Sequence, residues 1–200
     1  FPRGGGALAR RVLAASMATD GSFDFDASSY MTKERDDATK DYVMQQVMVR
    51  VKDPKASLDF YCKTLGFNLI MYREFPQWEF NVYFVAPIDP ALIPGTPEEQ
   101  WQVCMNTPGC VELTWNYGSE TEEGRVYNTG NSDATGSSDG EKVRGGFGHL
   151  GITVPDVYEA CQRFQDLGCE FSKTPNSGGM KGLGESIVLY RATTAATTTA

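Results

Sequence analysis

The stretch Gln46-Val-Met-Val-Arg-Val-Lys-Asp53 is repeated in altered form as His149-Leu-Gly-Ile-Thr-Val-Pro-Asp156. When the two octapeptides are aligned, a valine near the end and the final aspartate coincide, and each copy continues into a segment that ends in Leu-Gly. An internal repeat of this kind indicates a duplicated structural unit. Because Gln46 and His149 occupy the same position of the two copies, the repeat predicts one chemical site built from both halves.

The first copy has the pattern of a βαβββ unit. Alternation over residues 42–51 predicts a strand, and Asp53-Pro54 predicts a helix start, with the aspartate as N-cap and the proline in the first turn. Gly66 is expected to end this helix. Aromatic-rich strands are predicted at 67–75 and 78–85, an irregular segment at 87–109, and a last strand at 110–116.

The second copy begins in the same way and then runs short. A strand is predicted at 147–154, a helix from Pro155-Asp156 to Leu167, a strand at 169–172 and a short strand at 186–190. The repeat is one strand short at its end. The predicted fold class is therefore α+β, with paired βαβββ modules of which the second is incomplete.

Five segments are expected along the chain: an acidic or targeting arm (1–41), the first module (42–118), a polar connector (119–145), the second module (146–191) and an Ala/Thr tail (192–200). Residues 1–16 are rich in Arg and Ala, which is typical either of an organellar transit segment or of a translated leader upstream of Met17. The tail cannot bury an apolar face and is expected to be disordered.

Composition excludes several classes of function. The net charge of −8 over 200 residues argues against a non-specific nucleic-acid binder. The sequence holds five cysteines but no C-x-x-C pair, which favours a reducing compartment over a disulfide framework. No apolar run is long enough to span a membrane. A cytoplasmic location is expected, with mitochondria or plastids as the alternative if residues 1–16 are a transit segment.

Strand alternation places candidate ligands on two neighbouring faces. Gln46 and Arg50 share one strand face, and Glu112 shares another with Asn116. Each of these residues could simply face solvent, and His149 could be an ordinary sheet histidine. Glu112, however, lies between apolar neighbours, where a carboxylate is rarely left without a partner. Oxygen from Gln46 and Glu112 with nitrogen from His149 suits zinc or nickel in an open site.

Several segments together resemble the glyoxalase I (lactoylglutathione lyase) family over about residues 40–183. They are Gln45-Gln46-Val-Met-Val-Arg50-Val-Lys-Asp-Pro, Ser57-Leu-Asp-Phe-Tyr61, Val111-Glu112-Leu-Thr-Trp-Asn116, Asn128-Thr-Gly-Asn-Ser-Asp133, Gly146-Phe-Gly-His149 and Pro155-Asp-Val-Tyr158. The resemblance implies a vicinal-oxygen-chelate fold, a homodimer with sites between chains, and isomerisation of the hemithioacetal of methylglyoxal and glutathione to S-lactoylglutathione.

The resemblance also implies roles for individual residues. Gln46, Glu112 and His149 match the family's metal ligands. Residues that match glutathione contacts are Arg50, Asn116, Arg144, Lys173, Gly179 and Met180. Arg and Lys suit the two carboxylates of glutathione. The long insertion before Phe147 resembles the zinc-associated enzymes of the family, so zinc is preferred to nickel.

The end of the sequence departs from the family pattern. The family has a further glutamate that is both metal ligand and proton-transferring base, and after Leu183 no residue here matches it. The catalytic base is therefore unassigned, and we expect weak activity or none from this chain. The alternative is a non-catalytic protein that binds glutathione conjugates or pairs with an intact subunit. An extradiol dioxygenase is disfavoured, because those enzymes use two histidines and this sequence has only one.

Overall fold

The computed structural model describes residues 26–31, 34–127, 135–136, 142–143, 147–175 and 188–191. The chain divides into two compact units, Phe1–Tyr42 and Val43–Ala200. In the first unit, the short helix η1 (Ala27–Tyr30) is capped by Asp26, whose carboxylate accepts from the N–H of Ser28. Everything that bears on the candidate site belongs to the second unit.

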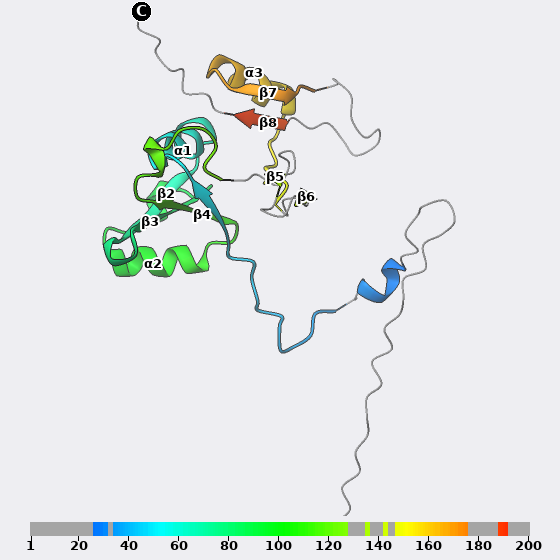
Figure 1. Ribbon diagram of the computed structural model, residues 1–200. Coiled ribbons are helices and arrows are strands. Elements are labelled where there is room, and N and C mark those ends of the chain that lie inside the picture. The colour runs from blue at the N-terminus through cyan, green and yellow to red at the C-terminus, as the bar shows by residue number, and fades with distance from the viewer. Residues whose placement is uncertain are drawn as a thin grey trace, which may run out of the picture. The chain divides into compact units, whose positions relative to one another are not determined.

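A mixed four-stranded sheet forms the centre of the first half of that unit (Figure 1). Its strands are β1 (Gln46–Val51), β2 (Asn68–Phe75), β3 (Phe80–Ala86) and β4 (Cys110–Asn116), in the spatial order β1-β4-β3-β2. The first and last strands are parallel neighbours, while the other two pairs are antiparallel. With a helix between its first two strands, this is the predicted βαβββ unit, and the expected α+β class is confirmed.

The helix after β1 begins where the sequence predicts. Helix α1 (Pro54–Leu58) continues as a π-helical stretch, η2 (Asp59–Thr64). The Asp53 carboxylate accepts hydrogen bonds from two backbone N–H groups of the first turn, and Pro54, which has no N–H to leave unpaired, follows it. The chain leaves the helix at Gly66, whose φ of +77° is a conformation that glycine adopts without strain.

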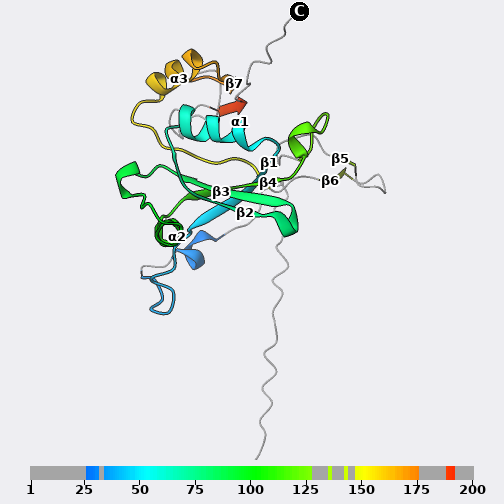
Figure 2. The ribbon, with the colours of Figure 1, turned by 90° about the vertical axis from the view of Figure 1, so that its left-hand side faces the viewer.

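Two hydrophobic clusters cover opposite faces of the sheet. Leu58, Tyr61 and Leu65 pack with the valines of β1 and with buried Leu113 on one face. Residues of a second helix, α2 (Pro97–Asn106), among them buried Cys104, pack against Ile70 of β2 on the other face. Figure 2 accordingly shows the sheet between α1 and α2. Burial on both faces holds the strands that carry the candidate site.

Helix α2 (Pro97–Asn106) corrects one prediction, because residues 87–109 were expected to be irregular. The segment also holds a short helix, η4 (Pro90–Leu92). The N-terminus of α2 is a capping box: the N–H of Glu99 donates to the hydroxyl of Thr96, which in turn donates to the Glu99 carboxylate. The local signal is Thr96-Pro-Glu-Glu99, in which proline occupies the first turn, where it breaks no hydrogen bond of the helix.

The second half holds helix α3 (Val157–Asp166), capped by Asp156, and an antiparallel pair formed by β7 (Glu170–Lys173) and β8 (Val188–Arg191). Residues 147–154, predicted to be a strand, are irregular in the structure. A strand is stable only when it is paired, and this segment pairs with none of the described strands. Other short elements are η3 (Pro76–Trp78), η5 (Ser119–Thr121), β5 (Thr135–Gly136) and β6 (Lys142–Val143).

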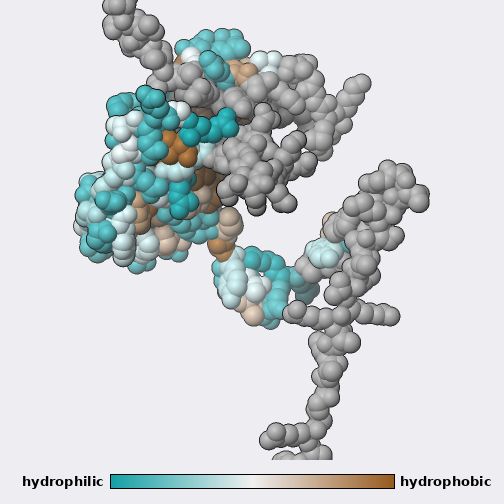
Figure 3. All heavy atoms as spheres, viewed as in Figure 1, coloured by the Kyte–Doolittle hydropathy of each residue, from teal (hydrophilic) through white to brown (hydrophobic). Residues whose placement is uncertain are grey.

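Hydrophilic and neutral residues cover most of the coloured surface in Figure 3, in keeping with the acidic composition. None of the helices in the described part of the chain is long and apolar enough to cross a membrane.

Candidate metal and substrate site

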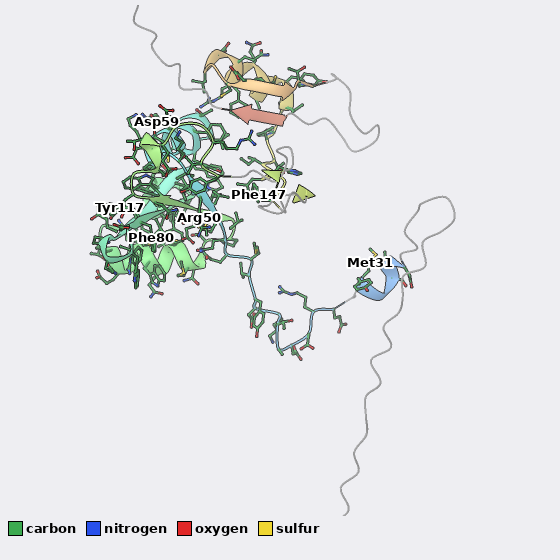
Figure 4. All side chains as sticks on the ribbon, viewed as in Figure 1. Met31, Arg50, Asp59, Phe80, Tyr117 and Phe147 are labelled. Atoms are coloured by element: carbon green, nitrogen blue, oxygen red, sulfur yellow. The ribbon has the colours of Figure 1, made fainter. Side chains whose placement is uncertain are left out.

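A row of side chains runs along the two parallel strands. Gln46, Met48 and Arg50 alternate on β1, and Glu112, Thr114 and Asn116 alternate on β4, with Met48 in register with Glu112 and Arg50 with Thr114. Because alternate residues of neighbouring strands share a face, all six lie on one side of the sheet. We call them the β1–β4 row. Figure 4 labels Arg50 on β1 and Phe80 on β3 of the same sheet.

Gln46 and Glu112 are joined directly within this row. The Gln46 Nε2 donates a hydrogen bond to Glu112 Oε2, across 66 residues of sequence. The other oxygen of the carboxylate, Oε1, lies 3.4 Å from the hydroxyl of Thr114. Gln46 is only partly exposed, as is Glu112. The parallel pairing of the first and last strands therefore brings together two of the three predicted ligands.

The side-chain amide oxygen of Gln46, Oε1, is the unusual atom of the site. It is buried, and no hydrogen-bond partner reaches it from the described residues. A buried carbonyl oxygen without a partner loses its hydration without compensation, at a cost of about 1–3 kcal/mol. Such an atom needs an explanation, and a bound ion or an ordered water is one of the usual ones.

The third predicted ligand shares a cavity with the first. Gln46 and His149 both line a hollow of about 360 Å³, whose wall is otherwise mainly apolar and includes Tyr61 and Phe67. His149 is exposed and so presents its imidazole to whatever enters. Burial raises the pKa of the Tyr61 phenol, which therefore stays protonated at neutral pH and does not serve as a base.

These donors fit a divalent metal of the zinc or nickel type. The amide oxygen of Gln46, which no described residue pairs with, and the Glu112 carboxylate lie together, and the exposed imidazole of His149 lines the cavity that Gln46 also lines but Glu112 does not. By chemical type the three groups are a mixed oxygen and nitrogen donor set. Within the described ranges, no group of three or more His, Cys, Asp and Glu residues gathers as a metal site.

Arg50 and Asn116, predicted to hold glutathione, lie at the other end of the β1–β4 row. Arg50 is exposed, and Asn116 is partly exposed. The Nδ2 of Asn116 donates a 2.9 Å hydrogen bond to the hydroxyl of Tyr127 in the connector. The structure thus places an exposed cation and a fixed amide on the face that also bears Gln46 and Glu112, whereas the cavity of His149 is lined by Tyr61 and Phe67 of the α1 side.

Four predicted contacts stay untested. Arg144, Gly179 and Met180 lie outside the described residues. Lys173 is the last residue of β7, and its side chain is not described. These assignments remain predictions.

Sequence reasoning missed two residues that shape the site. Tyr127 bonds Asn116, and Lys52, the residue after β1, donates to the backbone carbonyls of Glu122 and Gly124. Lys52 lies in the first copy of the repeat, where no role was predicted for it, and Tyr127 belongs to none of the quoted motifs. A tyrosine at the end of a polar connector carries no local sign of its partner, so only the spatial contact reveals it.

Comparison with known proteins gives consistent matches. The family model described as Glyoxalase/Bleomycin resistance protein/Dioxygenase superfamily matches residues 43–185. The lactoylglutathione lyase of Pseudomonas putida is 40% identical over 153 residues, covering 76% of this chain and 83% of that protein. The Pseudomonas aeruginosa lactoylglutathione lyase is 36% identical over 162 residues, covering 81% and 85%. The resemblance read from the motifs is confirmed.

Among solved structures, a glyoxalase I of Leishmania major matches with a TM-score of 0.46 and 20% identity, covering 74% of this chain and 79% of that one. A likeness of this size carries no argument about function.

Proposed function

Because the chain belongs to the Glyoxalase/Bleomycin resistance protein/Dioxygenase superfamily, we propose that it is a glyoxalase I-type lyase. Its substrate is the hemithioacetal of methylglyoxal and glutathione, and its product is S-lactoylglutathione, as expected from relatives named lactoylglutathione lyase. One observation carries the proposal: the buried side-chain oxygen of Gln46 has no partner among the described residues, and this side chain is bonded to Glu112 and lines a cavity with His149.

Gln46, Glu112 and His149 would hold the metal, with zinc preferred to nickel. When bound, the metal supplies positive charge that stabilises the anion formed as a carbon-bound proton is removed. Of the protein groups, Gln46 fixes the Glu112 carboxylate by its hydrogen bond. Tyr61 and Phe67 line the apolar part of the cavity and limit the access of water.

The length of the β1–β4 row suits glutathione. Gln46 and Arg50 are four residues apart on one strand, which corresponds to roughly 13 Å. An extended three-residue peptide spans at most about 11 Å, and the reacting carbons are joined to its central residue. A terminal carboxylate of an adduct bound at Gln46 therefore falls short of the Arg50 backbone, and the long side chain of Arg50 bridges the remaining distance. An exposed guanidinium is well suited to hold that carboxylate by paired hydrogen bonds.

Two further parts of the proposal concern assembly and location. We infer a homodimer with sites between chains; Met48, in the middle of the β1–β4 row, is 42% exposed, and such an assembly would cover it. We also infer a reducing, cytoplasmic compartment, because all five cysteines are free.

A second candidate function is binding of glutathione conjugates without turnover. In the described part of the chain, the wall of the Gln46 and His149 cavity carries no Asp or Glu. A carboxylate that could move the proton between the two carbons is therefore not assigned. A protein with the metal ligands and the glutathione contacts alone would bind the substrate and leave it unchanged.

Turnover and binding assays separate the two functions. The metal-free protein, with and without added Zn²⁺ or Ni²⁺, is given the hemithioacetal, and formation of S-lactoylglutathione is followed. Binding of the unreactive thioether S-hexylglutathione is measured by calorimetry. Metal-dependent turnover that is lost in Glu112→Gln supports the lyase. The matched control is Glu74→Gln, which changes an exposed carboxylate on β2 of the same sheet. Tight binding with no turnover supports the second function, and neither binding nor turnover contradicts both.

A further inference from the structure

We propose that Tyr127 is a positioning residue for Asn116, and that it orients this amide toward the glutathione moiety. The two side chains are 11 residues apart, yet the Nδ2 of Asn116 lies 2.9 Å from the Tyr127 oxygen, and both groups are partly buried. This inference rests on the proposed function and adds a residue that the motifs do not include.

Hydrogen bonds hold the first part of the segment between Asn116 and Tyr127 against the sheet. The hydroxyl of Ser119, which is 2% exposed, donates 2.8 Å to the carbonyl of Lys52, at the end of β1. The ammonium of Lys52 donates in return to two carbonyls, those of Glu122 and Gly124. The Trp115 indole adds a 2.9 Å bond to Glu120. These contacts hold residues 119–124 against the sheet, so the segment just before Tyr127 is held in place.

The direction of the Asn116–Tyr127 bond determines what the amide can offer a ligand. An asparagine side chain has two N–H donors and one acceptor oxygen. Tyr127 takes one N–H, which fixes the plane of the amide and leaves Oδ1 and the second N–H in defined directions. The carbonyl oxygen then suits a ligand N–H, either the ammonium group or a peptide N–H of glutathione. Without Tyr127 the amide can rotate, and the binding contact must be ordered when the ligand arrives.

The expected effect is one of affinity. Removing the Tyr127 hydroxyl in Tyr127→Phe keeps the ring and deletes one neutral hydrogen bond, so S-hexylglutathione should bind roughly 3- to 10-fold more weakly. For a chain that turns over, KM should rise by a similar factor with kcat unchanged, because the amide contacts a part of the substrate that does not react.

The test is a double-mutant cycle measured by calorimetry with S-hexylglutathione on the full chain: wild type, Tyr127→Phe, Asn116→Ala and the double variant. We expect Asn116→Ala and the double variant to bind equally, because the hydroxyl acts only through Asn116. The matched control is Tyr117→Phe, which deletes a 2.8 Å bond from a tyrosine hydroxyl to the buried Asn81. It should lower thermal stability and leave affinity within about twofold, because its hydroxyl bonds Asn81 and shares no partner with Asn116.

The outcomes separate this inference from the proposed function. If the wild type fails to bind S-hexylglutathione, the proposed function is wrong and the role of Tyr127 falls with it. If the wild type binds and Tyr127→Phe binds equally well, the inference alone is wrong. It is also wrong if the effects of Tyr127→Phe and Asn116→Ala are additive, or if Tyr117→Phe weakens binding as much as Tyr127→Phe.

Discussion

Replacing Gln46 by alanine should remove the stabilisation that zinc gives the protein, while changing the metal-free protein little. The substitution deletes two features of opposite sign. One is the hydrogen bond from its Nε2 to Glu112, which stabilises the fold. The other is its buried side-chain oxygen Oε1, which has no partner among the described residues and destabilises the fold. Their effects should nearly cancel when no metal is present, whereas the loss of a ligand acts only when metal is present.

The sizes of these effects can be compared. Leaving the partly buried Glu112 carboxylate without its donor costs about 1–3 kcal/mol, and removing an unsatisfied buried oxygen returns a similar amount. The metal-free variant should therefore unfold within about 1 kcal/mol of the wild type. At free Zn²⁺ one hundred times Kd, binding stabilises the wild type by about 2.7 kcal/mol. For a domain of this size that is a rise in Tm of roughly 5–11 °C.

The assay is thermal unfolding by scanning calorimetry, with Zn²⁺ buffered at one hundred times the Kd found for the wild type. Gln46→Ala should lose most of the Tm shift, and His149→Ala should do the same. Gln100→Ala is the matched control. It also removes a partly buried glutamine, one whose Nε2 donates 2.9 Å to the Pro94 carbonyl, and should keep the full shift because it does not line the Gln46 and His149 cavity.

Two results would refute this reasoning. One is a wild-type Tm that does not respond to Zn²⁺ or Ni²⁺, which would mean that the Gln46 oxygen is not a ligand. The other is an equal response in the wild type and in Gln46→Ala, which would place the metal elsewhere in the chain.

Three further predictions concern stability. Leu113→Ala should lower the free energy of unfolding in urea by about 3 kcal/mol, because the side chain is 0% exposed between sheet and helix; a loss under 1 kcal/mol would contradict close packing there. Thr96→Ala should cost about 1 kcal/mol by calorimetry through loss of the α2 cap, and no change would mean that the cap is dispensable. Hydrogen bonds from Lys55, and next from Lys63, lower the pKa of Asp59 in the folded protein. The ionised Asp59 therefore stabilises the fold above about pH 4, and this stabilisation is lost as the pH falls through the lowered pKa. Urea midpoints of wild type and Asp59→Asn should therefore converge in acid, and a constant difference would refute the assignment.

The parts of the fold that depend on neighbouring residues could be predicted from the sequence. Asp53 as cap, Pro54 in the first turn and Gly66 at the exit are local signals, and the structure has them all in place. Alternation likewise predicted the strand 110–116. Helix α2 was missed although its capping signal was local, and the predicted strand at 147–154 is irregular because strand formation depends on a partner that no short stretch of sequence specifies.

For the candidate site, the repeat singled out Gln46 and His149, and the apolar neighbours of Glu112 marked that carboxylate. Which atoms meet was decided by the tertiary structure. Pairing of the first strand with the last places Gln46 against Glu112, leaves one oxygen buried without a partner in the described part of the chain, and brings Asn116 to Tyr127. Sequence pattern determines which face a side chain occupies, because that follows from the period of the backbone. Which residue it contacts depends on how strands far apart in the sequence pair, and the alternation within one strand carries no information about that pairing.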